Sequence, residues 1–223
     1  MVNQTKKSIG IVLAGGLGNR MNDNKPKQYL YLLDKEIISY SIDAFKNSKF
    51  LDDFYIVLNP NSDEEERIRD QYNVKTIIGG NTRNDSIRNA LEYIKANVSD
   101  CDKLFLNDAA RPLITSEIID FYLKKLDTHD YIYTAVKITD ALGTIDNRYV
   151  DRSNHILVQA PEGYHFKDIY ECFQRDAHTT YPGHTLPSSH SAYQYFDYRD
   201  NIKITYPEDI GLAEYLLSLR RVY

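Results

Sequence analysis

Short apolar runs alternate with longer amphipathic segments through the first 126 residues of the chain. The runs are continuous over four or five positions, which is typical of strands buried on both faces. They lie at residues 9–13, 54–58, 75–78 and 103–106. The segments between them have the apolar spacing of helices, at residues 37–45, from Ser62 onward, at 84–96 and at 115–126. Strands that alternate with helices predict an α/β fold with a mostly parallel central sheet.

The pattern changes after residue 130. Residues 131–138 and 155–158 are strand-like, and the stretch between them is polar with little helical periodicity. We interpret residues 131–158 as a projecting β-arm, and we expect it to pack on a second subunit because two strands alone are rarely stable. The alternative is a long surface loop. The remaining chain predicts a helix at 166–177, a loop at 178–194, a strand at 201–205 and a last helix from Pro207 to about residue 220.

Composition limits the function classes. The 223 residues suit a single domain, here taken as 1–223, and 27 basic against 32 acidic residues give a net charge of −5. That balance argues against a nucleic-acid partner bound through a broad basic surface. We expect no membrane partner and a cytoplasmic location, because the sequence shows neither a signal-peptide h-region nor an apolar run of about 20 residues. The two cysteines are far apart and indicate neither a zinc site nor a disulfide framework.

A glycine-rich segment directly follows the first apolar run. It reads Leu13-Ala14-Gly15-Gly16-Leu17-Gly18-Asn19-Arg20-Met21, with Pro26-Lys27-Gln28 shortly after it. Glycines let a ligand approach the backbone, and successive N–H groups in such a loop form an anion-binding concavity. Arg20 and Lys27 add two positive charges, so the segment predicts a triphosphate site. The P-loop and dinucleotide patterns do not fit, and an ordinary strand-to-helix turn is the alternative.

Two further polar loops follow strands at the same predicted sheet edge. Residues 79–83 follow the third strand and residues 107–112 follow the fourth. In parallel sheets, ligands bind beyond the carboxyl ends of the strands, so we expect the three loops to form one site. Asp108 is then a candidate ligand for Mg²⁺, which takes one or two carboxylates together with phosphate oxygens. The alternative role of Asp108 is to stabilise a turn or to pair with Arg111.

Five blocks, taken in order, resemble one family nearly end to end. They are the glycine segment, Pro26-Lys27-Gln28-Tyr29-Leu30, Gly79-Gly80 with Arg83 and Ser86, Asp108-Ala109-Ala110-Arg111-Pro112, and Asn201-Ile202-Lys203-Ile204-Thr205 before Pro207-Glu208-Asp209. The chain is similar to the bacterial cytidylyltransferases. These include 2-C-methyl-D-erythritol 4-phosphate cytidylyltransferase and the polyol-phosphate enzymes of capsule and teichoic-acid synthesis. The resemblance implies a Rossmann-like nucleotidyltransferase fold, CTP as a substrate, Mg²⁺ as cofactor and a homodimer joined by β-arms.

The resemblance also implies roles for single residues. The catalytic residues would be Arg20, Lys27 and Lys203, and Asp108 would take the metal. The nucleotide-binding residues would be Leu13, Ala14, Gly15, Gly16, Gly18, Asn19, Gly79, Gly80, Arg83 and Ser86. The acceptor-binding residues would be Arg111, Thr205 and Arg152, the last of which would bind the acceptor phosphate of the neighbouring subunit.

Two blocks on the acceptor side depart from the erythritol-phosphate enzymes. Those enzymes carry Gln-Thr-Pro-Gln after the arm, where this chain has Gln159-Ala160-Pro161-Glu162. They also carry a Thr-Asp-Asp/Glu block, where this chain has residues 186–192 without the acidic pair. His190 in that segment is a candidate for hydrogen bonds to acceptor hydroxyls, with an exposed loop histidine as the alternative.

These departures lead us to predict a polyol-phosphate cytidylyltransferase. It would act on glycerol, ribitol or arabinitol phosphate for a surface polymer. The first alternative is the isoprenoid enzyme acting on methylerythritol phosphate. The second is a nucleotide-binding module that has lost catalysis, against which the intact Arg20, Lys27 and Asp108 argue.

Overall fold

A sheet of seven strands forms the centre of the molecule. The computed structural model describes residues 6–18, 20–21, 25–173, 179 and 181–220. Within them the strands lie in the order β5-β4-β1-β6-β8-β7-β9. Their bounds are β1 Lys7–Ala14, β4 Asp53–Leu58, β5 Lys75–Ile78, β6 Cys101–Asp108, β7 Tyr131–Lys137, β8 Ile156–His165 and β9 Ala192–Tyr195. Strands β5, β4, β1 and β6 are parallel, and β8 runs antiparallel to both β6 and β7. The predicted α/β class and the mostly parallel sheet are confirmed.

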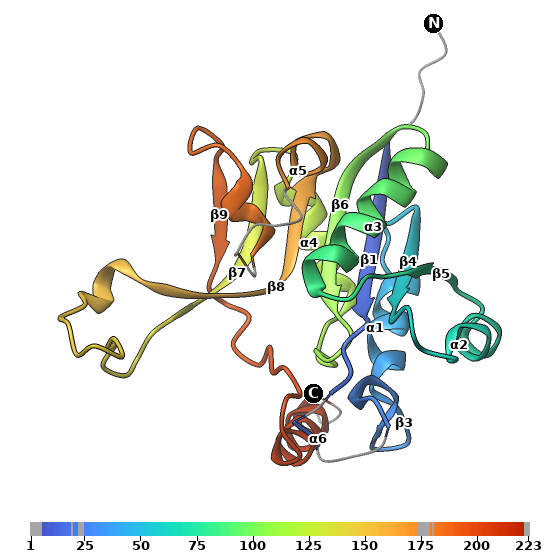
Figure 1. Cartoon of the computed structure of the whole chain (residues 1–223), viewed down its shortest axis with the longest axis horizontal. Helices are drawn as coiled ribbons and strands as arrows, with labels where there is room; N and C mark the ends of the chain where they lie inside the picture. The colour runs from blue at the N-terminus through green and yellow to red at the C-terminus, as the bar shows by residue number, and fades with distance from the viewer. Residues whose placement is uncertain (1–5, 19, 22–24, 174–178, 180, 221–223) are drawn as a thin grey trace, which may run out of the picture.

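Helices cover both faces of this sheet (Figure 1). Their bounds are α1 Ile37–Lys46, α2 Glu65–Tyr72, α3 Arg83–Asn97, α4 Ser116–Lys125, α5 Phe166–Cys172 and α6 Glu208–Arg220. Apolar residues of α1 and α4 pack on one face, and those of α3 and α5 pack on the other. Strand residues alternate between the two cores, as the period of two requires. For example, Phe105 faces α1 and α4, whereas Leu104 and Leu106 face α3.

Helix starts follow the expected capping chemistry. The side chain of Thr115 accepts a hydrogen bond from the N–H of Ile118 at the start of α4. Thr82 and Asp85 form a reciprocal capping box at the start of α3. Three short 3-10 helices complete the helical elements of the described chain, at Lys27–Tyr29, Arg152–Asn154 and Pro182–Thr185. A two-stranded sheet of β2 (Tyr31–Leu32) and β3 (Lys35–Glu36) precedes α1.

The second half of the chain differs from its sequence prediction in three places. Strand β9 begins inside the predicted loop 178–194. Its polar and aromatic residues do not form the alternating apolar pattern that predicts a strand. Residues 201–205 form no strand. Instead, the N–H of Ile204 donates to the carbonyl of Ala110 at 2.8 Å, which brings this segment to the end of β6. Helix α5 ends at Cys172, and residues 174–178 lie outside the described chain.

The segment predicted as a β-arm, residues 131–158, includes two strands that are part of the central sheet. Pairing of β7 with β8 ends at Lys137 and Ile156, and both strands belong to the central sheet. The segment between these two residues extends away from the sheet as a long excursion (Figure 1). Ile145 and Tyr149 on it are 110% and 90% exposed. Dimerisation through this arm stays a prediction.

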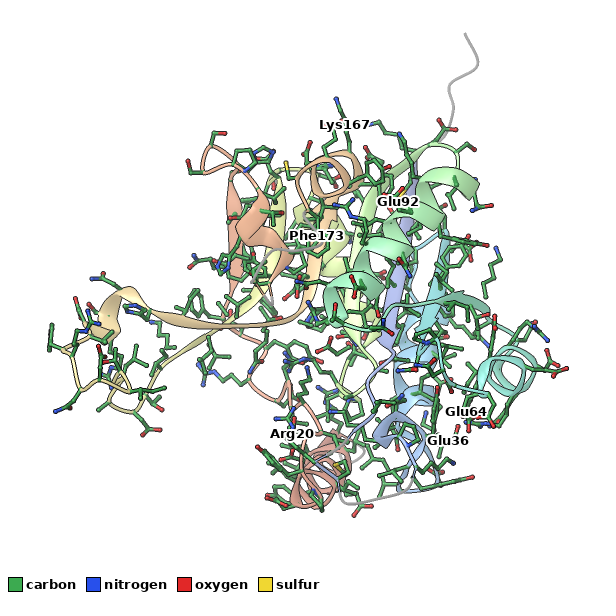
Figure 2. The ribbon with its side chains drawn as sticks, in the orientation of Figure 1. Arg20, Glu36, Glu64, Glu92, Lys167 and Phe173 are labelled. Atoms are coloured by element: carbon green, nitrogen blue, oxygen red, sulfur yellow. The ribbon has the colours of Figure 1, made fainter. Side chains whose placement is uncertain are left out.

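The two ends of the sheet carry different side chains. Arg20 lies at the end where β1 stops, near α6, whereas Glu92 and Lys167 lie at the opposite end (Figure 2). None of the helices in the described ranges is long and apolar enough to cross a membrane.

Candidate active site

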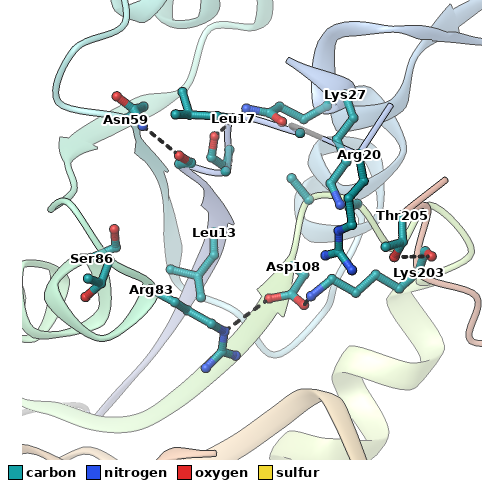
Figure 3. Close-up of a pocket in the computed structure, with 18 of the residues that line it drawn as sticks. Leu13, Leu17, Arg20, Lys27, Asn59, Arg83, Ser86, Asp108, Lys203 and Thr205 are labelled. Atoms are coloured by element: carbon teal, nitrogen blue, oxygen red, sulfur yellow. Dashed lines mark hydrogen bonds and ion pairs between the residues drawn. The ribbon is translucent and has the colours of Figure 1, made fainter. Parts of the chain in front are cut away.

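A pocket of about 450 Å³ opens at the carboxyl ends of β1, β4 and β6. Its walls come from the glycine segment, the start of α3, the end of β6 and residues 203–205 (Figure 3). The three loops that the sequence predicts to form one site therefore do meet at this edge of the sheet.

The glycine segment is held in shape from two sides. Gln28 Nε2 donates to the carbonyl oxygen of Ala14 at 2.7 Å, and Asn59 Nδ2 donates to that of Gly15 at 2.8 Å. Gly18 has a φ of +72° and lies against Lys27, where a Cβ atom would be 3.0 Å from the Lys27 nitrogen. A side chain at position 18 would be strained by the dihedral angle and crowded by its neighbour.

Basic side chains line one wall of the pocket. Lys27 Nζ donates to the carbonyl oxygen of Ile204 at 2.7 Å. Partial burial, then the nearby charges of Lys203 and Arg20, lower the pKa of Lys27 to about 8. The guanidinium of Arg20 lies 5.4 Å from the centre of the Tyr206 ring. This concentration of positive charge suits an anionic ligand such as a triphosphate.

Asp108 lies at the floor of the pocket, only 8% exposed, among three cations. Its Oδ2 accepts from Lys203 Nζ at 2.7 Å and lies 3.8 Å from Arg111 Nε, while Oδ1 lies 3.6 Å from Arg83 Nε. Burial raises the pKa of this carboxyl, but Arg83, Lys203 and Arg111 outweigh it and hold the pKa well below its usual range. The Asp108 carboxyl is thus held in its ionised form.

The donor set around Asp108 fits a magnesium ion that is held mainly by substrate phosphates. No cluster of three acidic, histidine or cysteine side chains that could hold a metal occurs within the described residues. A single carboxylate beside a phosphate pocket is the arrangement that Mg²⁺ accepts, because it keeps waters and takes phosphate oxygens.

The start of α3 forms the wall opposite Arg20, Lys27 and Lys203 (Figure 3). The N–H of Gly80 donates to Ser86 Oγ at 3.0 Å, and a Cβ atom at Gly80 would lie 2.2 Å from the Asp85 Cβ. Only glycine fits this contact. Gly79 packs behind Gly80, where its N–H donates to the carbonyl of Leu58 at 2.8 Å. Arg83 and Ser86 both line the pocket.

Most of the predicted site residues come together here. Those lining the pocket are Leu13, Ala14, Gly15, Gly16, Gly18, Arg20, Lys27, Gly80, Arg83, Ser86, Asp108, Lys203 and Thr205. Asn19 lies outside the described residues. Arg111 is buried behind the floor and donates to the carbonyl of Asn201 at 2.8 Å.

Two predicted acceptor residues lie apart from this pocket. Arg152 is in the arm, where it donates to the main-chain carbonyl of Asp140 at 3.3 Å and to that of Thr139. His190 precedes β9 at the opposite end of the sheet, with its Nε2 3.7 Å from Asp168 Oδ2. The pocket of one chain gives no support to an acceptor role for His190.

Comparison with known proteins identifies the family. The family model of 2-C-methyl-D-erythritol 4-phosphate cytidylyltransferase matches residues 9–219. An enzyme of that name from Caldicellulosiruptor bescii is 30% identical over 95% of this chain and 98% of its own length. One from Clostridium botulinum (strain 657) is 32% identical over 96% and 98%. The chain belongs to the 2-C-methyl-D-erythritol 4-phosphate cytidylyltransferase family.

Solved structures agree on the fold of this cytidylyltransferase. A 4-diphosphocytidyl-2C-methyl-D-erythritol synthase from Anaerococcus prevotii superposes with a TM-score of 0.80 at 22% identity, covering 96% of both chains. The Thermus thermophilus 2-C-methyl-D-erythritol 4-phosphate cytidylyltransferase gives a TM-score of 0.73 at 19% identity over 95% of this chain and 98% of its own. The predicted Rossmann-like nucleotidyltransferase fold is therefore confirmed.

The predicted polyol-phosphate acceptor is wrong. The family model and the high-coverage relatives all point to the erythritol-phosphate branch. The sequence prediction gave too much weight to two altered blocks. One of them, residues 186–192, lies at the sheet end opposite the pocket, so its changes say little about the acceptor bound by the same chain.

Three residues in and around the cytidylyltransferase pocket were not predicted as site residues. Gln28 and Asn59 hold the glycine segment, and Glu162 on β8 binds Arg83. Asn59 directly follows β4 at the ligand edge, so the strand-end rule could have found it. Glu162 belongs to the altered block 159–162, but nothing in the sequence shows that β8 pairs with β6 and so brings Glu162 to Arg83.

Proposed function

We propose that this protein transfers CMP from CTP to 2-C-methyl-D-erythritol 4-phosphate and releases pyrophosphate. The observation that carries the proposal is the family match over residues 9–219. The relatives with the same printed activity cover 95–96% of this chain, which supports carrying over the acceptor as well as the nucleotide.

The pocket supports a nucleotide bound across it. The N–H groups of the glycine segment and the charges of Arg20, Lys27 and Lys203 would hold the triphosphate. Gly80, Ser86 and Arg83 would surround the cytosine and ribose. Asp85 leaves no room for a side chain at position 80. Leu13, Ala14 and Asn19 belong to this proposed nucleotide site as well.

The reaction needs positioning and charge stabilisation more than an activated side chain. An acceptor phosphate oxygen attacks the α-phosphorus in line, and the bond to the β-phosphate oxygen breaks. Arg20 and Lys27 would neutralise the charge that develops on the phosphorus and on the leaving pyrophosphate. Asp108 would hold Mg²⁺, which supplies Lewis-acid polarisation of the nucleotide phosphates when bound.

The acceptor side is proposed to involve a second subunit. Thr205 lines the pocket and Arg111 supports its floor. Arg152 lies in the projecting arm, so we propose that it reaches the acceptor phosphate in the partner's pocket within a homodimer. The exposed Ile145 and Tyr149 support this proposal, because a dimer would remove them from water.

Pyrophosphate release is the direct test. The protein is assayed with CTP, ATP, GTP or UTP and with methylerythritol, glycerol or ribitol phosphate, using Lys27→Ala as the inactive control. We expect release with CTP and methylerythritol phosphate and a much slower reaction with every other pair. Turnover with glycerol or ribitol phosphate alone would overturn the proposal.

A further inference from the structure

A buried glutamate lies directly behind the pocket. Glu162 is 2% exposed and belongs to β8, where it pairs in register with Leu106 on β6. Paired residues on adjacent strands project on the same side of a sheet, and so do residues two apart along a strand. Glu162, Tyr164 and Asp108 therefore share the face that α3 covers, and Arg83 is the first residue of α3.

Arg83 bridges the two acids on this face. Its Nη2 donates to Glu162 Oε1 at 3.2 Å, and its Nε lies 3.6 Å from Asp108 Oδ1. The hydroxyl of Tyr164 donates to the other oxygen, Glu162 Oε2, at 2.5 Å. Figure 3 shows the guanidinium of Arg83 below Asp108, with the ion pair to Asp108 drawn.

Each contact limits the freedom of the next. Tyr164 is 1% exposed and fixes Glu162, and Glu162 fixes one end of the guanidinium. Arg83 itself lines the pocket, whereas Glu162 does not. The Arg83 guanidinium is therefore shared between Glu162 and Asp108.

We propose that Glu162 is a positioning residue that sets the orientation of Arg83 in the nucleotide pocket. It acts through Arg83 and does not contact CTP. The inference rests on the proposed nucleotide role of Arg83. In Glu162→Gln, the amide oxygen can still accept from Arg83, and the amide nitrogen can donate to the hydroxyl of Tyr164. The charge is lost, so the guanidinium turns toward Asp108 and away from its position in the pocket.

The test is a double-mutant cycle read by CTP binding. Isothermal titration with Mg²⁺ and CTP, in the absence of acceptor, measures the Kd of wild type, Glu162→Gln, Arg83→Gln and the double variant. We expect Glu162→Gln to raise the Kd about fivefold or more, as for a weakened hydrogen bond to a charged group. In the Arg83→Gln background, the same change should have less than about a twofold effect, because the residue it positions is gone.

Controls separate positioning from a structural role. Arg83→Gln alone leaves a buried acid without its cation, so the double variant, in which both groups are neutral, provides a folded reference. Glu36→Gln removes the charge of another buried glutamate bound by an arginine and a tyrosine. It should lower the melting temperature and leave the Kd of CTP unchanged.

The outcomes are distinct. Equal effects of Glu162→Gln in both backgrounds, or an unchanged Kd in the wild-type background, would overturn the positioning role. A wild-type protein that binds no CTP would overturn it together with the nucleotide role of Arg83. Failure of methylerythritol phosphate as acceptor would instead overturn the proposed function and leave this cycle intact.

Discussion

Two buried glutamates in this protein are both bound by an arginine and a tyrosine, but their pKa values shift in opposite directions. Glu36 on β3 is 5% exposed and accepts from Tyr72 at 2.7 Å, Arg67 at 3.0 Å and Lys25 at 3.1 Å. Glu162 on β8 is 2% exposed and accepts from Tyr164 and Arg83. Figure 2 shows Glu36 near Glu64, which also pairs with Arg67.

The pKa values of the two acids shift in opposite directions. Burial raises the pKa of Glu36, but hydrogen bonds from Tyr72, Arg67 and Lys25 outweigh it and lower the pKa overall. Burial also raises the pKa of Glu162, and Arg83 with Tyr164 does not cancel it. The charge of Glu36 is therefore balanced by Lys25 and Arg67, whereas Glu162 shares Arg83 with Asp108.

Charge balance distinguishes a structural cluster from a ligand site. Around Glu36, two cations meet two carboxylates, counting Glu64. The pocket cluster holds five basic side chains against two carboxylates. Its members are Arg20, Lys27, Arg83, Asp108, Arg111, Glu162 and Lys203. A protein retains such an excess of positive charge at a cost in stability, and an anionic ligand accounts for it.

The largest expected effect is on Lys27. Replacement by alanine should lower kcat by on the order of 10²-fold or more, because a charge that stabilises the transition state is lost. The melting temperature at pH 7 should stay the same or rise, since the lowered pKa of Lys27 shows that the fold disfavours its charged form. Steady-state kinetics and a thermal melt check both.

The pH dependence of the wild-type enzyme provides a second check on Lys27. With a pKa of about 8 in the free protein, kcat/KM should fall as pH rises above about 8. Near-normal turnover by Lys27→Ala would remove Lys27 from the mechanism and would weaken the contrast between the two clusters.

Arg152 belongs to neither cluster, and its replacement should affect the acceptor but not the nucleotide. Arg152→Ala should raise KM for the acceptor about tenfold or more, as expected for loss of a charge-assisted phosphate contact, and leave the Kd of CTP unchanged. A collapse in CTP affinity would show that the proposed role of the arm is wrong.

Co-expression tests whether Arg152 acts across subunits. In a mixed dimer of Lys27→Ala and Arg152→Ala chains, one pocket receives wild-type Lys27 and the partner's wild-type Arg152. Random pairing should then restore about a quarter of wild-type activity from two impaired variants. No recovery would mean that Arg152 serves its own chain or that the chains do not pair.

The sequence predicts well which loops come together around the pocket. The residues there follow buried strands directly, so period and topology rules place the glycine segment, Arg83 and Asp108 at one edge. Segment 201–205 belongs to the same site although its predicted strand does not form. Long-range hydrogen bonds hold this segment, such as those from Ile204 to Ala110 and from Arg111 to Asn201, and no local pattern encodes them.

The identity of the acceptor was predicted wrongly for a physical reason. Glu162 and His190 both lie in altered blocks, but strand pairing sends them to different ends of the sheet. Register is a tertiary property, and a β8 strand that pairs antiparallel with β6 leaves no mark in local composition. The prediction of a different acceptor treated two unrelated positions as one site.

Glu36→Gln should affect stability without affecting catalysis. We expect the free energy of unfolding at pH 7 to fall by about 1.5–3 kcal/mol, the range for hydrogen bonds to a charged group, with kcat/KM unchanged. Urea unfolding and steady-state kinetics measure the two. A loss of activity without a loss of stability would mean that Glu36 contributes to the active site, and the Glu36 cluster would no longer serve as a purely structural comparison.

Acid should change the two glutamate variants in opposite directions. The lowered pKa of Glu36 stabilises the fold above the unfolded value of about 4.3, and this contribution is lost as pH falls through the folded pKa. The raised pKa of Glu162 disfavours the fold as pH rises from that value through the folded pKa. As pH falls from 7 to about 4, wild type should gain stability relative to Glu162→Gln, and as pH falls further it should lose stability relative to Glu36→Gln.

The smallest expected effect concerns Tyr206, whose ring holds Arg20 without adding negative charge. Its N–H donates to Asp209 Oδ2 at 2.8 Å and the residue is 46% exposed, so a substitution changes little except the cation–π contact. Tyr206→Leu should lower kcat/KM about two- to fivefold, equivalent to about 0.5–1 kcal/mol, whereas Tyr206→Phe keeps the ring and should match wild type. In an Arg20→Ala background the leucine change should have no effect. Equal losses in the leucine and phenylalanine variants would assign the effect to the hydroxyl, and the pocket would then hold Arg20 by a means other than the ring face.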